Sequence, residues 1–143
     1  MHRASNSPPS ISFILKTISD DKALTLFNNI ALTKNNSHVS LKEMNLRTKQ
    51  YNLRISGLIS AGLIKKKQGQ YYLTPLGKIV YNSNTVIEKA LSCYWKIKAI
   101  ETAGTGLAIE DRQLLIESLI DNHQVRDILL MSLPNTQALE MGR

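Results

Sequence analysis

Apolar residues recur at intervals of three and four along most of the chain, and this spacing predicts a mainly helical protein. One apolar stripe runs over residues 11–18, a second over 23–31, a third over 51–62, and two more lie within 107–133. The pattern changes at two short strand-like runs on either side of Gln68-Gly69, which predict a β-hairpin. We therefore expect helices interrupted by one hairpin.

Capping signals indicate where several helices begin. Ser40-Leu41-Lys42-Glu43 has the spacing of a capping box, and Leu46 is the only apolar residue of the turn that follows, so we expect it in the core. Thr74-Pro75 is typical of a helix start, with Thr at the N-cap and Pro at the first helical position. Asn82-Ser83-Asn84 should end that helix. A second capping box, Thr85-Val86-Ile87-Glu88, should then open a helix of about 18 residues.

The helix expected over 85–103 carries a heptad seam. Its members are spaced 4, 3, 4 and 3 residues apart: Val86, Ala90, Cys93, Ile97 and Ile100. Neighbouring faces add further apolar surface: Ile87, Leu91, Tyr94 and Trp95. One stripe can pack on its own domain and another on a second chain, so we expect a homodimer with the seam as its interface. The alternative is a helix packed wholly within one chain.

Composition limits the class of protein. The 143 residues suffice for one domain with a terminal appendage, and 43% of them are hydrophobic. No apolar run approaches the ~20 residues of a membrane helix, and Met1 to Pro9 lacks the apolar stretch of a secretory signal. A lone Cys93 cannot form an internal disulfide, which fits a reducing compartment. We expect a cytoplasmic protein without a membrane partner.

Charge is distributed unevenly along the chain. The formal net charge is +7, but residues 1–100 hold 15 Lys and Arg against 4 Asp and Glu, whereas residues 101–143 hold 3 against 7. Across 40–80 there are 8 basic residues, and Glu43 is the one acidic residue. A basic body implies a polyanionic partner such as nucleic acid. Solubility alone is the alternative.

The order of motifs over 40–77 carries a resemblance. Ser40 through Ile64, then Lys65 to Leu73, then Thr74-Pro75-Leu76-Gly77 resembles a winged helix-turn-helix DNA-binding domain of the MarR-like, ArsR-like and related small archaeal regulators. The similarity covers roughly residues 11–103. It implies binding of double-stranded DNA, a wing at Lys65 to Lys67, and dimerisation through terminal helices. The implied fold class is mainly α, a winged helix-turn-helix with a two-stranded β-hairpin wing and additional C-terminal helices.

Residues 47–54 have the side chains that a helix in the major groove needs, opposite an apolar side that packs on the protein. Gln50 and Asn52 offer bidentate geometry to adenine, and Arg47 or Arg54 to guanine. Thr48 and Lys49 suit phosphates. The alternatives are an ordinary solvated helix face and, for the wing, lysines that protect an edge strand. The expected DNA-binding residues are Arg47, Thr48, Lys49, Gln50, Asn52, Arg54, Lys65, Lys66 and Lys67.

Catalytic or metal-ligating patterns are not recognisable in the sequence. The candidate ligands lie far apart without ligand spacing: His2, His38, His123 and Cys93. Asp20-Asp21 and Glu110-Asp111 are explained by helix starts. We expect no enzymatic activity, no metal and no cofactor. Two alternatives stay open: a winged-helix module that binds protein and not DNA, and a sensor whose small-molecule effector, or oxidation at Cys93, shifts DNA affinity.

The expected organisation has five parts. They are a disordered lead at 1–9, a winged helix-turn-helix DNA-binding domain at 10–82, a long dimerisation helix at 83–103, acidic C-terminal helices at 107–133 and a frayed tail at 134–143.

Overall fold

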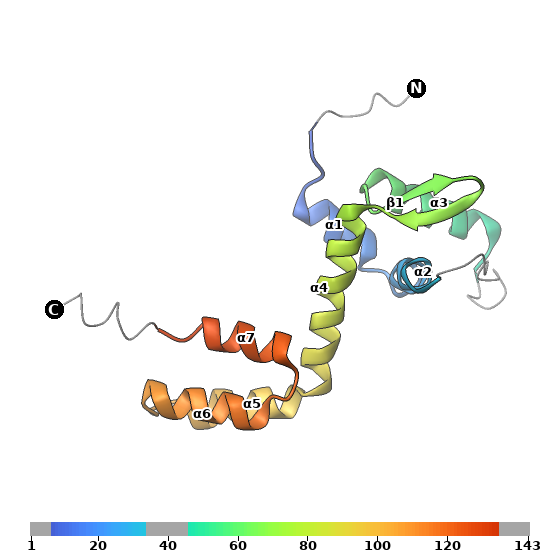
Figure 1. Cartoon of the computed structure of the whole chain (residues 1–143). Coiled ribbons are helices and arrows are strands. Elements are labelled where there is room, and N and C mark those ends of the chain that lie inside the picture. The colour runs from blue at the N-terminus through green and yellow to red at the C-terminus, as the bar shows by residue number, and fades with distance from the viewer. Residues whose placement is uncertain (1–6, 34–45, 135–143) are drawn as a thin grey trace. The chain divides into compact units, whose positions relative to one another are not determined.

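The computed structural model describes residues 7–33 and 46–134 (Figure 1). The chain divides into two compact units, Met1–Asn82 (unit 1) and Ser83–Arg143 (unit 2). The elements in chain order are α1 Ile11–Ile18, α2 Asp21–Leu32, α3 Thr48–Ser60, β1 Ile64–Lys67, β2 Gln70–Leu73, α4 Pro75–Ser92, α5 Tyr94–Gly104, α6 Ile109–Leu119 and α7 His123–Met131. The expectation of a mainly helical chain with one small antiparallel hairpin is confirmed. The predictions made for 1–6, for the capping box at 40–43 and for 135–143 lie outside the described residues.

Unit 1 is built around one apolar core. Phe27, Leu58 and Leu63 are fully buried at its centre. Helix α1 packs on α2 and α3, strand β1 on α3, and strand β2 on α2. Leu46 is only 7% exposed and belongs to this core, as its isolated apolar position predicted. The core thus holds α3 and the hairpin in fixed positions.

The first helix forms where expected but buries a narrower face. Ser10 caps it by accepting a hydrogen bond from the Phe13 amide at 3.1 Å. Ile14 and Ile18 contact the core, whereas Ile11 and Leu15 are exposed. Helix α1 therefore contacts α2 and α3 through the side that carries Ile14 and Ile18.

The hairpin turn has the conformation that its sequence favours. Gln68 and Gly69 both adopt positive φ, 54° and 77°, as a two-residue type I′ turn requires. This turn fixes the register, in which Lys65 pairs with Tyr72 and Lys67 with Gln70. The hairpin predicted around Gln68-Gly69 is therefore confirmed.

Helix α4 begins as its Thr-Pro start predicts. The Thr74 hydroxyl accepts a hydrogen bond from the Gly77 amide at 2.9 Å and donates to the Gly62 carbonyl at 2.5 Å. Gly62 follows α3 with φ of 76°, which is the left-handed conformation of a glycine after a helix end. A single threonine side chain thus joins the end of α3 to the start of α4.

The prediction of a helix break at 82–84 and a new start at Thr85 is wrong. Helix α4 runs through this segment to Ser92, and the break comes at Cys93. Asn and Ser cost well under 1 kcal/mol each inside a helix, and the Asn82 amide donates to the Lys78 carbonyl one turn earlier at 2.8 Å. At Cys93 the backbone leaves helical geometry, with φ of −114° and ψ of 31°. The expected 85–103 helix is therefore two helices.

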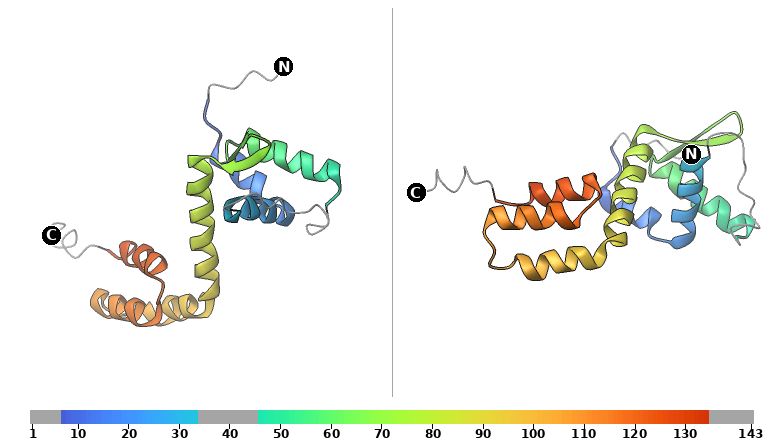
Figure 2. Two further views of the ribbon diagram at one scale, coloured as in Figure 1. Left: turned by 45° about the vertical axis from the view of Figure 1, so that its right-hand side comes forward. Right: turned by 60° about the horizontal axis from the view of Figure 1, so that its bottom comes forward.

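Unit 2 has its own small core. Ile116, Ile120 and Val125 are buried at its centre, contributed by α6, the residue after α6, and α7. Helix α5 lies beside α6, and α6 beside α7 (Figure 2). The seam residues all pack against this core within the chain: Val86, Ala90, Cys93, Ile97 and Ile100. These seam residues are half-buried by this packing, while the neighbouring apolar residues of the same segment are exposed. The homodimer stays a prediction.

Candidate nucleic-acid interface

Helix α3 has one buried side and one polar side. Ile55 and Leu58 are buried in the core of unit 1, and Tyr51 is half-buried beside them. Burial raises the pKa of the Tyr51 phenol, and Tyr71 adds to the effect, so this group stays a neutral hydroxyl. The predicted contact residues at the helix start and in the first two turns are all exposed: Arg47, Thr48, Lys49, Gln50 and Asn52. By helical spacing Lys49 and Asn52 lie on the side away from the core, whereas Arg47 and Thr48 are exposed because they stand at the end of the helix. Helix α3 itself contains no acidic residue.

The start of α3 holds two of these residues in place. Arg47 is the N-cap in an extended conformation, and its carbonyl accepts the first helical bond from the Tyr51 amide at 2.9 Å. The Arg47 amide donates to the Gln50 side-chain oxygen at 3.4 Å. Gln50 therefore folds back over the helix start, as the last residue of a capping box does.

Arg54 is placed differently from its predicted neighbours. Its Nε donates to the Asp20 carboxylate at 2.5 Å, and its Nη1 donates to the Gln50 carbonyl at 3.3 Å. The Arg54 side chain is 21% exposed, against 44% for Asp20. The hydrogen bond from Arg54 is the main cause that lowers the pKa of Asp20. Arg54 thus connects α3 to the start of α2, and its guanidinium is already committed within the chain.

Sequence inspection missed Leu53. This side chain is 71% exposed, and its position four residues after Lys49 and three before Ser56 places it on the polar side of α3. The available signal was that Leu53 falls outside the Tyr51, Ile55 spacing of the buried side. An exposed apolar group in a polar helix face can contact a thymine methyl group.

The hairpin divides its three lysines between its two faces, as strand alternation predicts. Lys65 and Lys67 share the face of Tyr72 and are exposed. Lys66 lies on the opposite face, where its Nζ is 5.7 Å from the centre of the Tyr71 ring. The ring can hold an ammonium by a cation–π contact. Two of the three hairpin lysines are therefore exposed together on one side.

Helix α4 carries a basic residue near the hairpin lysines that lies outside the candidate interface. Lys78, one turn into α4, is exposed and lines a surface hollow together with Lys65 and Lys67. Its position on a helix after the hairpin gave no signal in the spacing, because only the fold of unit 1 brings these segments together.

In the part of the chain that the structure describes, no three His, Cys, Asp or Glu side chains cluster in a way that could hold a metal ion. Among residues 7–33 and 46–134, no helix is both long enough and apolar enough to cross a membrane.

Comparison of the chain with protein-family models, with curated proteins and with solved structures gave no match.

Proposed function

We propose that unit 1 is a winged helix-turn-helix domain that binds double-stranded DNA sequence-specifically and regulates transcription. The observation that carries the proposal is the exposed side of α3. It combines Lys49 and Asn52, with Arg47 exposed at the helix start, and it has no carboxylate, while the opposite side is anchored by Ile55 and Leu58 in the core. A helix that enters the major groove needs this division between a reading side and a packed side.

In this proposal the polar side of α3 reads bases. Asn52 faces adenine and Arg47 faces guanine, because these groups can form paired hydrogen bonds with base edges. Gln50, whose side-chain oxygen accepts a hydrogen bond from the Arg47 amide, holds the helix start instead. Thr48 and Lys49 hold phosphates and set the register of the helix. Arg54, predicted earlier as a base contact, instead positions α3 through its ion pair with Asp20.

The wing supplies sequence-independent affinity. Lys65 and Lys67 share one exposed face of the hairpin, where their ammonium groups can neutralise backbone phosphates. Each neutralised phosphate releases condensed counterions, so the logarithm of the association constant falls with the logarithm of the salt concentration by a slope of about −0.9 per phosphate. The wing thus contributes to binding of any duplex, and α3 selects among them.

We further propose that the homodimer expected from the sequence forms on unit 2, through a surface different from the seam. The outward side of α4 and α5 exposes four large apolar residues: Ile87, Leu91, Tyr94 and Trp95. The Trp95 side chain is 80% exposed, and its ring contacts that of Tyr94 edge-on at 5.1 Å. The seam is occupied by the chain's own core, so this neighbouring stripe is the surface that a second chain can bury.

The test is binding of the full chain to duplex DNA from the upstream region of its own gene, against random duplex, by fluorescence anisotropy at several salt concentrations. Tighter, salt-sensitive binding to the upstream duplex supports the proposal. Replacing Asn52 with Ala should cost about 1–3 kcal/mol on that duplex and relax its sequence preference. Equal losses on random duplex would contradict base reading by Asn52.

The wing is tested by the salt slope. The double variant Lys65→Ala/Lys67→Ala should bind every duplex more weakly, and its salt dependence should be less steep by about one to two units of slope. The double variant Lys16→Ala/Lys22→Ala removes the same charge from α1 and α2 and is the matched control, whose slope should stay unchanged. Equal slopes in both variants would remove the wing from the interface.

A second candidate function is a winged-helix module that docks on protein. The exposed apolar side chains of α3, Leu53 and Ile59, favour it, because a protein partner would bury them. Absence of binding to both duplexes at low salt would reject the DNA proposal in favour of this one.

A further inference from the structure

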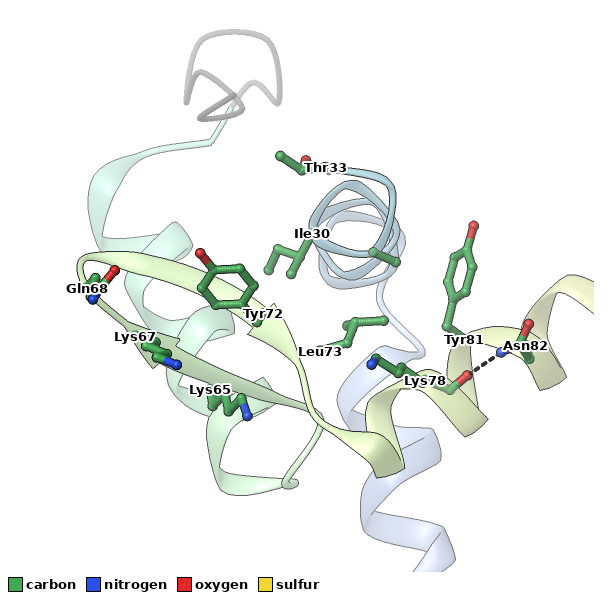
Figure 3. A pocket seen from close by; sticks show the side chains of 11 residues that line it. Ile30, Thr33, Lys65, Lys67, Gln68, Tyr72, Leu73, Lys78, Tyr81 and Asn82 are labelled. Carbon is green, nitrogen blue, oxygen red and sulfur yellow. Dashed lines mark hydrogen bonds between the residues drawn. The ribbon is translucent and has the colours of Figure 1, made fainter. Parts of the chain in front are cut away.

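A basic hollow lies beside the hairpin in unit 1, away from the buried side of α3. Its volume is about 680 Å³, within the roughly 300–1,000 Å³ typical of small-molecule sites. The hairpin, the end of α2 and the first two turns of α4 form its walls (Figure 3). All three walls belong to one compact unit.

The charge of this hollow is strongly one-sided. Lys65 and Lys67 contribute ammonium groups from β1, and Lys78 contributes a third from α4 (Figure 3). Among residues 7–33 and 46–134, no Asp or Glu lines the hollow, and none forms an ion pair with any of the three lysines. The end of α2 at Thr33 adds only about half a negative charge. Three full positive charges therefore dominate, which suits phosphate groups.

The hollow also has an apolar part beside its lysines. Ile30 of α2 and Leu73 of β2 line it, and the Tyr72 ring stands over it with 44% of the residue exposed (Figure 3). The Tyr72 hydroxyl donates to Gln70 Oε1 at 2.8 Å, which orients the ring. Aromatic rings of this kind stack on the flat face of a base. The hollow thus combines a part that fits a charged group with an adjacent part that fits a planar one.

We propose that this hollow binds a nucleotide, with its phosphates on the three lysines and its base against Tyr72. This site goes beyond the proposed DNA contacts, because Lys78 and Tyr72 have no part in them. Lys65 and Lys67 belong to both sites. A bound nucleotide therefore occupies lysines that the DNA backbone would otherwise contact, and DNA affinity falls as the nucleotide concentration rises.

The experiment titrates the full chain with ATP, adenosine and tripolyphosphate in the absence of DNA, by isothermal titration calorimetry at two salt concentrations. ATP should bind, and adenosine, which lacks phosphates, should bind at least tenfold more weakly. Lys78→Ala should weaken ATP binding roughly tenfold, as expected for the loss of one charge-assisted contact. The matched control Lys16→Ala, an exposed lysine on α1 outside the hollow, should stay within twofold of the wild type.

Further variants separate the two parts of the hollow. Tyr72→Ala should weaken ATP and leave tripolyphosphate unchanged, because only ATP has a base. Absence of ATP binding at millimolar concentration, or equal losses in Lys78→Ala and Lys16→Ala, would overturn the site. Equal affinity for ATP and tripolyphosphate would overturn the assignment of the apolar part to a base.

The outcome is distinguishable from failure of the proposed function, because this titration contains no DNA. Loss of DNA binding with intact ATP binding would reject only the DNA proposal. If both ligands bind, ATP should raise the apparent Kd for duplex in the wild type and do so far less in Lys78→Ala. ATP that binds but leaves the duplex Kd unchanged would overturn the competition at Lys65 and Lys67.

Discussion

Gly77 lies in the first turn of α4, where its amide donates to the Thr74 hydroxyl at 2.9 Å. A Cβ atom added at this position would meet the Leu63 carbonyl oxygen at 2.0 Å and the Leu63 carbonyl carbon at 3.0 Å. The obstacle is backbone, and it is fixed because the same carbonyl accepts a hydrogen bond from the Thr74 amide at 3.0 Å. Gly77→Ala must therefore push α4 away from the segment between α3 and β1 by about 1 Å or more.

Two opposing effects decide the size of the change. Replacing glycine by alanine in a helix favours folding by about 0.5–1 kcal/mol. Overpacking against a fixed neighbour costs about 1–3 kcal/mol and more in severe cases, and a 2.0 Å contact is severe. We expect Gly77→Ala to destabilise unit 1 by about 2 kcal/mol, which lowers its Tm by roughly 8–16 °C.

The assay is hydrogen–deuterium exchange with mass spectrometry on the full chain, combined with thermal unfolding by circular dichroism. Peptides from unit 1 should exchange faster in Gly77→Ala, while peptides from α6 and α7 should be unchanged. Gly57→Ala is the matched control, because its added Cβ meets only Thr17 Cγ2 at 3.7 Å, an ordinary contact. That variant should be as stable as the wild type or more so. Equal stability of the two variants would refute the clash.

Three further predictions follow from the same structure. The pKa of Asp20 is lowered from 3.8 in the folded chain. Its ion pair with Arg54 therefore contributes stability that is present above about pH 4 and lost as the pH falls through the lowered pKa. Asp20→Asn should remove this part of the acid dependence of the unfolding free energy, measured by urea titrations from pH 2 to 7. Ile120→Ala should destabilise unit 2 by about 2–5 kcal/mol, measured by exchange of α5–α7 peptides, since Ile120 is fully buried there. Replacing Leu91 and Trp95 with Ser should convert dimer to monomer in sedimentation velocity while Leu114→Ser, an equally exposed leucine on α6, should not; unchanged sedimentation of both variants would contradict the proposed dimer surface.

The residues of the candidate interface show where sequence inspection reached its limit. The polar side of α3 followed from local spacing, because side chains three and four residues apart share a helix face. Arg54 shares that spacing, yet it bonds to Asp20, which lies 34 residues away in the chain. Lys78 lines the same hollow as Lys65 and Lys67, although it lies on a helix and they lie on a strand. Neither the Arg54–Asp20 contact nor the grouping of the three lysines can be recognised from the spacing of neighbouring residues.

The sequence by itself determined the local structure of this protein. The Thr74-Pro75 helix start, the positive φ at Gly62 and the turn at Gln68-Gly69 depend on the conformational preferences of a few neighbouring residues. These preferences act over one turn and need no distant partner.

Tertiary structure decided which apolar surface is buried. Helix α4 continues through Asn82-Ser83-Asn84 to Ser92, although these residues favour helix ends. Of two apolar stripes with similar spacing, the one containing Ile97 packs on Ile116 and Ile120, and the one containing Trp95 stays outside. Periodicity shows that a helix has an apolar face, but the free energy of burying that face depends on which surfaces the rest of the chain brings against it.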